Sequence, residues 1–146
     1  MKQFILSTLL IFAGAILLSP VAFTSHARGA AKYVTAQDRG FSVPEYESFH
    51  DALHPLQHEA LPQKDFKRIR AAAAKLVALG DAIVKVGVPR GVDQNKHQEF
   101  KAGLKMFGEK LVKFKADADK GTDDQLKESY SAVHDSFETL AAMLPK

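Results

Sequence analysis

Four segments with helical periodicity, separated by proline and glycine, constrain the fold of this chain most strongly. They cover about residues 44–61, 62–86, 92–119 and 122–144. In each segment apolar residues recur at steps of three and four, the spacing that lines one face of an α-helix. None of them alternates apolar and polar residues as a half-buried strand does. The sequence therefore predicts an all-α fold, an antiparallel up-down-up-down four-helix bundle.

The apolar stripe of each segment predicts the core. The expected core residues are Phe49, Leu53, Leu56 and Ala60, then Phe66, Ile69, Ala73, Leu76, Gly80 and Ile83, then Phe100, Leu104, Phe107, Leu111, Phe114 and Ala118, and finally Leu126, Tyr130, Val133, Phe137, Leu140 and Leu144. Pro55 interrupts the first segment, because its ring clashes with the carbonyl four residues earlier and it has no N–H to donate. We therefore expect the first helix to kink or divide at Pro55.

The start of the chain has the pattern of a secretory signal peptide. Lys2 gives a basic beginning, residues 4–18 are almost wholly apolar, and Ser25-His26-Ala27 places small residues at the two positions that a signal peptidase reads. We expect cleavage after Ala27, which would leave a periplasmic or secreted protein that is not attached to a membrane. An uncleaved anchor over residues 4–23 is the alternative, since about 20 apolar residues span a bilayer.

The rest of the chain predicts one domain. Residues 28–43 are polar and lack a sustained period, so they predict a flexible leader, and residues 44–146 predict a single bundle domain. There is no cysteine, so core packing must stabilise the domain without a disulfide. The net charge of +3 is mild and the lysines are scattered, which argues against a nucleic-acid partner. The sequence also has no nucleophile elbow and no phosphate-binding loop, so we expect a protein that is not an enzyme.

Three histidines stand at intervals of four in the first helical segment: His50, His54 and His58. Four residues turn an α-helix by one turn plus ~40°, so the three imidazoles form a slowly drifting row along one face. Neighbours in such a row have Cβ atoms ~5–6 Å apart, which lets two ring nitrogens reach one metal ion.

The predicted bundle topology brings other histidines to the same end. With a rise of 1.5 Å per residue, His54 and His134 both lie ~15 Å from the end at which the first helix begins, and His50 and His97 lie nearer to it. The sequence predicts a metal site built from His50, His54 and His134, with His97 and His58 as further candidate ligands. The alternative is that these histidines lie at the edge of the core and bond to carboxylates or carbonyls.

Imidazole ligands indicate which metals to expect. Neutral imidazole suits zinc, copper and nickel, and the lack of thiolates argues against a dedicated cuprous site. We expect a transition metal ion, zinc or copper first, and a function in metal buffering, sensing or delivery. A non-metal ligand-binding or protein-interaction bundle is the alternative function, and the oligomeric state, including a homodimer, stays open.

The fourth segment resembles a known family. Residues 126–140 are similar to the last helix of the cytochrome c-prime family and of related b-type four-helix cytochromes, in which a Cys-x-x-Cys-His motif binds haem. His134 matches the haem-ligating histidine, but Tyr130 and Val133 stand where the two cysteines would be. The resemblance therefore implies a four-helix scaffold without covalent haem.

The first segment, with its three histidines, resembles uncharacterised exported proteins that look like haem-less relatives of that bundle. What this implies is a retained scaffold with a different ligand. Non-covalent haem held between His134 and either His50 or His54 is the remaining alternative.

Export gives a testable prediction. Mass spectrometry of the protein from its native compartment should find Arg28 as the first residue, because cleavage is expected after Ala27. An intact Met1 in the membrane fraction would contradict the prediction.

Overall fold

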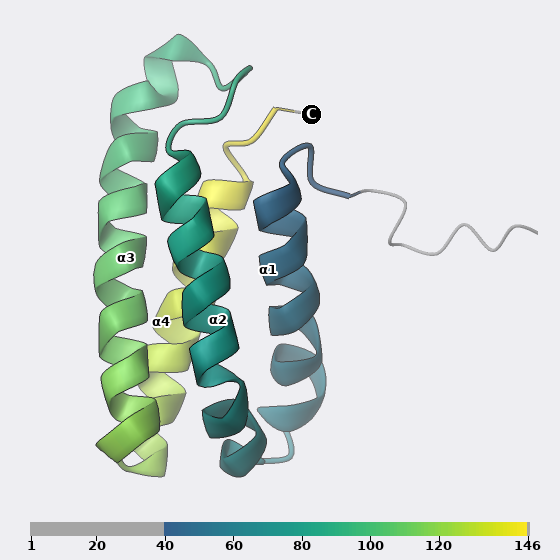
Figure 1. The fold of residues 1–146 in the computed structure, drawn as a ribbon, viewed down its shortest axis with the longest axis vertical. Coiled ribbons are helices and arrows are strands. Elements are labelled where there is room, and N and C mark those ends of the chain that lie inside the picture. Colours follow the sequence, from purple (N-terminus) through teal and green to yellow (C-terminus); the bar gives the residue numbers. More distant parts are fainter. Residues whose placement is uncertain (1–39, 146) are drawn as a thin grey trace, which may run out of the picture. The chain divides into compact units, whose positions relative to one another are not determined.

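The computed structural model describes residues 40–145, so the predicted signal peptide and most of the predicted leader lie outside the described residues. The elements are α1 (Pro44–Pro55), a π-helical turn η2 (Leu56–Ala60), α2 (Phe66–Val86), a 3-10 turn η3 (Gln94–Lys96), α3 (His97–Lys120) and α4 (Asp123–Ala141). Successive helices run in opposite directions in Figure 1, and residues 40–145 contain no strand. The predicted all-α four-helix bundle is confirmed.

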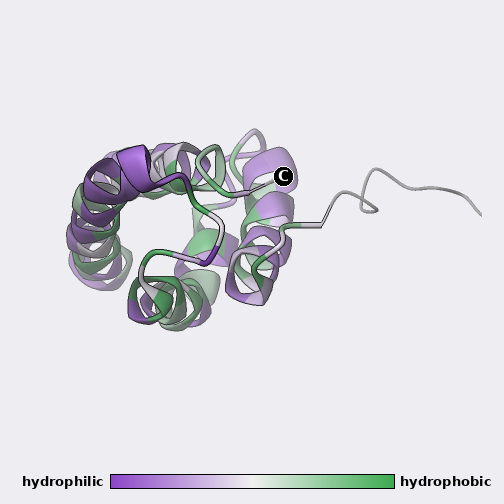
Figure 2. Cartoon of the chain, turned by 90° about the horizontal axis from the view of Figure 1, so that it is seen from above, coloured by the Kyte–Doolittle hydropathy of each residue, from purple (hydrophilic) through white to green (hydrophobic). Residues whose placement is uncertain are grey.

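The helices follow one another around the bundle. α1 lies against α2, α2 against α3, and α3 against α4. Side chains connect α4 back to α1: the rings of Phe49 and Phe137 lie 4.9 Å apart, and the Tyr130 hydroxyl donates a hydrogen bond of 3.3 Å to the Leu53 carbonyl. Each helix carries both hydrophobic and hydrophilic residues in the view of Figure 2, as helices that bury one face must.

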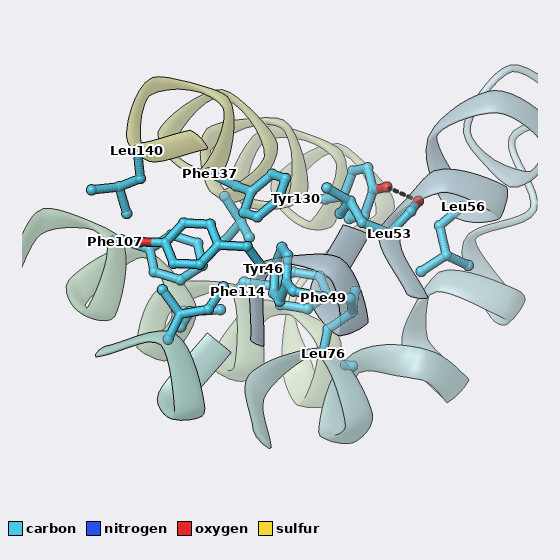
Figure 3. Close-up of a cluster of buried hydrophobic side chains, with 14 of the residues drawn as sticks. Tyr46, Phe49, Leu53, Leu56, Leu76, Phe107, Phe114, Tyr130, Phe137 and Leu140 are labelled. Atoms are coloured by element: carbon cyan, nitrogen blue, oxygen red, sulfur yellow. Dashed lines mark hydrogen bonds between the residues drawn. The ribbon is translucent and has the colours of Figure 1, made fainter. Parts of the chain in front are cut away.

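The predicted core is confirmed almost completely. Every residue of the four stripes is buried except Phe66, which is partly buried against the same core. Tyr46, one turn before Phe49, joins the core with no exposed surface. Figure 3 shows the aromatic centre of this core, to which α1, α3 and α4 all contribute rings.

The break at Pro55 takes the form of a π-helical turn. The Leu61 N–H donates to the Leu56 carbonyl at 2.9 Å, and the Asp65 N–H donates to the Ala60 carbonyl at 2.8 Å, both over five residues. The first segment is therefore α1 followed by η2, and not one α-helix.

The second and third helices begin later than predicted. α2 starts at Phe66, because the Asp65 carboxylate caps it by accepting from the Arg68 N–H at 3.0 Å. The 3-10 turn η3 precedes α3, so the α-helical part starts at His97. The predicted cap of α4 is confirmed, since Thr122 forms a reciprocal capping box with Gln125.

Arg70 of α2 holds the connection between α3 and α4. Its guanidinium donates to the carbonyls of Asp117, Ala118 and Gly121 and to the Asp123 carboxylate, each at 2.9 Å. The last carbonyls of a helix lack partners within the helix, so this side chain satisfies groups that would otherwise need water. One side chain thus joins three helices at the end of the bundle opposite the start of α1 (Figure 1).

Three residues assigned to the leader belong to the packed part of the domain. Val43 is buried, Phe41 packs against the core, and the Ser42 hydroxyl donates to the Pro145 carbonyl at 3.1 Å. The stretch is too short to show a helical period, which is why the sequence pattern did not separate it from the polar residues before it. No helix within residues 40–145 is both long enough and apolar enough to cross a bilayer.

The core assignment gives a prediction about stability. Phe107→Ala should lower the free energy of unfolding by about 3–5 kcal/mol, because it removes a large side chain with no exposed surface and leaves a cavity. Met106→Ala is the matched control, since its side chain is 52% exposed and should change stability by no more than about 0.5 kcal/mol. Chemical denaturation followed by circular dichroism measures both. Equal losses in the two variants would contradict the assignment.

Candidate metal centre

The three histidines of the first segment lie next to one another. The ring centroids of His50 and His54 are 5.5 Å apart, and those of His54 and His58 are 4.4 Å apart. His50 is partly buried, whereas His54 and His58 are exposed. His58 lies in the π-helical turn η2. The row thus consists of three adjacent imidazoles, of which the first, His50, is partly buried and the other two are exposed to solvent.

His50 lies on the side of α1 that faces α4. Its ring stacks near Phe137 of α4 with centroids 6.4 Å apart, and the edge of Phe41 approaches it at 5.4 Å. Two aromatic rings therefore flank His50. His54, one turn further along, continues the row toward solvent.

His134 lies on the side of α4 that faces α1. It follows Tyr130 by four residues and precedes Phe137 by three, and both of these residues contact α1. Residues at these spacings share one face of a helix, so His134 shares theirs. Figure 3 shows Tyr130 and Phe137 pointing from α4 toward α1. The two contacts lie on either side of His134 along α4 and so place it at the level of the region from Phe49 to Leu53.

We call this boundary, with His50 and His54 on α1 and His134 on α4, the α1–α4 seam. A carboxylate lies beside the His134 ring: Nδ1 is 3.1 Å from Oδ1 of Asp135, and the His134 side chain is 24% exposed. An ionised carboxylate only accepts hydrogen bonds, so the proton of a neutral His134 belongs on Nδ1. Nε2 then keeps the lone pair, and metal-binding histidines commonly have this arrangement of a carboxylate behind the ring.

His97 is held differently. Its Nε2 lies 3.0 Å from the Val92 carbonyl, which can only accept, so Nε2 carries a hydrogen. It begins α3, whose neighbours around the bundle are α2 and α4. The structure therefore ties His97 to the loop before α3 and does not bring it into the row on α1.

Imidazole nitrogens are suitable ligands for a transition metal ion. The side chains that the structure describes do not, however, form a complete set of ligands in the present arrangement. Imidazole nitrogens suit zinc and copper. Within residues 40–145, however, no three histidine, aspartate or glutamate side chains are arranged so that they could hold one ion together. The site would therefore have to complete its ligand set by movement of side chains. The ring centroids of neighbouring imidazoles in the row are 4.4 and 5.5 Å apart. Rotation about the side-chain bonds is therefore the movement that would turn their nitrogens toward one ion.

Sequence reasoning missed Phe41 as a neighbour of this site. The residue was assigned to the leader, yet its ring contacts His50 and Phe137. An isolated aromatic three residues before Pro44, in an otherwise polar stretch, was the available signal.

Comparison of this chain with protein-family models, with curated proteins and with solved structures gave no match in any of the three.

Proposed function

We propose that this chain is an exported four-helix bundle that binds a transition metal ion and buffers, senses or delivers it. The observation that carries the proposal is the row of three adjacent imidazoles on α1 and η2. His134 is proposed to join this row, because it lies between Tyr130 and Phe137, the two residues through which α4 contacts α1. Export rests on the sequence of residues 1–27. The chain acts by binding and carries out no reaction of its own.

His54 is the central ligand in this proposal, because it has an imidazole neighbour on each side. His134 adds a ligand from α4 through Nε2. His50 or His58 completes the set, depending on which neighbour turns toward the ion. Among these divalent ions, Cu²⁺ binds nitrogen ligands most tightly, and Ni²⁺ and Zn²⁺ bind them more weakly. The site should therefore bind Cu²⁺ more tightly than Zn²⁺.

A protein-interaction bundle is the second candidate function. Four large hydrophobic side chains on α2 and α3 are exposed: Val84, Val86, Met106 and Val112, the last of them 72% exposed. Exposed apolar side chains that gather in a patch are a mark of interaction sites. A protein that carries no metal when purified from its native compartment, and that fails to bind Zn²⁺ or Cu²⁺, would favour this function over the first.

The ligand set can be tested one helix at a time. His54→Ala and His134→Ala should each weaken Zn²⁺ binding at least about tenfold, since each removes a ligand of the same ion. His97→Ala is the matched control and should leave the affinity unchanged, because Nε2 of His97 already bonds to the Val92 carbonyl. Calorimetric titration of the purified chain measures all three. A wild-type affinity in His134→Ala would end the inter-helix site, and no binding by the wild type would end the metal function.

Metal binding should also stabilise the fold. A ligand that binds only the native state adds RT ln(1 + [L]/Kd), about 2.7 kcal/mol at a hundredfold excess over Kd. The melting temperature should therefore rise with Zn²⁺, and His134→Ala should remove most of the rise. Both effects should weaken in acid, where protons compete for the imidazole lone pairs. A melting temperature that ignores Zn²⁺ while the ion binds would show that the unfolded chain binds the ion equally well, and it would contradict a site that the fold builds between α1 and α4.

A further inference from the structure

Residues 40–43, which we call the strap, cross the beginning of α1 on the side of the seam. The Phe41 ring packs edge-on against His50 at 5.4 Å and against Phe137 at 5.7 Å. It also lies 6.4 Å from the ring of Tyr46. The His50 ring therefore lies between Phe41 of the strap and Phe137 of α4, and it is partly buried.

The strap is fastened at two points. The Phe41 N–H donates to Oε2 of Glu47 at 2.7 Å, and the Ser42 hydroxyl donates to the Pro145 carbonyl at 3.1 Å. The bond to Glu47 is charge-assisted, which makes it the stronger of the two. The strap thus bonds to the Glu47 carboxylate through the Phe41 N–H and packs against His50 through the Phe41 ring.

Glu47 belongs to the face of α1 that carries the histidine row. It precedes His50 by three residues and His54 by seven, and all three lie within α1. Residues at these spacings lie one above another on a helix, so a carboxylate and two imidazoles can face one ion. Glutamate oxygen is an ordinary ligand of zinc beside imidazole nitrogen.

We propose that Glu47 is a carboxylate ligand of the metal site and that the strap covers Glu47 and His50 until a divalent ion displaces it. The inference rests on the proposed metal-binding function and extends it with one ligand and a means of control. The ion first meets the exposed pair His54 and His58. Release of Phe41 then frees the Glu47 carboxylate and lets the His50 ring turn outward.

The proposal accounts for two observations together. The strap bonds to Glu47 and packs against His50, two side chains on the same face of α1. The row also runs from a covered histidine to two exposed ones. A strap that only completed the core would explain the packing of Phe41 and would leave the metal affinity independent of it.

Loss of the Phe41 ring should raise the affinity for Zn²⁺. Phe41→Ala should bind Zn²⁺ about tenfold more tightly than the wild type, since the ion no longer has to displace a packed ring; the backbone N–H that donates to Glu47 stays in the variant. Phe66→Ala is the matched control: Phe66 is likewise partly buried against the core, but it begins α2, and α2 begins at the end of the bundle opposite the start of α1 (Figure 1). Thermal unfolding without metal shows whether the two variants lose similar stability.

The role of Glu47 is tested in the background of Phe41→Ala. Adding Glu47→Gln should remove the tenfold gain, because the amide keeps the shape and loses the charged ligand oxygen. Glu45→Gln, also in the first turn of α1, is the control for loss of charge and should keep the gain. An equal affinity of wild type, Phe41→Ala and Glu47→Gln would overturn the inference and leave the histidine site intact. Failure of every chain to bind Zn²⁺, the wild type included, would overturn the proposed function and the inference with it.

A direct readout of the strap is available because the chain has no tryptophan. In Phe41→Trp, the emission of the single tryptophan should shift to longer wavelength as Zn²⁺ binds, with the same midpoint as the calorimetric titration. An emission that stays constant while Zn²⁺ binds would show that the strap does not move, and this result would also overturn the inference.

Discussion

The missing N–H of Pro55 is the constraint around which the seam between α1 and α4 is arranged. A proline inside a helix has no N–H to donate to the carbonyl four residues before it. In this chain a π-helical turn of residues 56–60 follows directly after Pro55. Just before the break, the Leu53 carbonyl accepts from the Leu56 N–H and from the Tyr130 hydroxyl of α4. Burial raises the pKa of Tyr130, so its phenol stays protonated and donates. A carbonyl near the break in α1 thereby forms a hydrogen bond with α4.

That contact is the basis for proposing that histidines from distant parts of the sequence bind one ion. Tyr130 and Phe137 attach α4 to α1, and His134 lies between them on the same face of α4. On α1, the row begins at His50 beside Phe137 and ends at His58 within the π-helical turn. The fold thus gives one pair of helices both the packing that stabilises the bundle and the imidazoles proposed to bind metal. The strap adds a cover at the inner end of the row.

The sequence predicts the core well because burial of one helix face imposes a period that survives in the pattern of apolar residues. It predicts less where the local structure depends on a single residue. Pro55 indicates a break, but a kink, a new helix and a π-helical turn are all compatible with the missing N–H. Phe41 has no periodic partner, so its packing against His50 depends on how residues 40–43 fold back across α1. The ring orientation of His134 depends on Asp135 beside it, and the ligand geometry depends on rotamers, neither of which a helical period encodes.

Histidines of α1 and α4 are proposed to bind one ion at the seam. Nitrogen-detected NMR of the imidazole rings during a Zn²⁺ titration tests this proposal most directly, because the rings of all the histidines are observed in a single sample. The ring nitrogens of His54 and Nε2 of His134 should shift together and saturate at one equivalent of Zn²⁺, while His97 should keep its bond to the Val92 carbonyl and not shift. Shifts confined to α1 and η2, with His134 unchanged at saturation, would contradict the proposal.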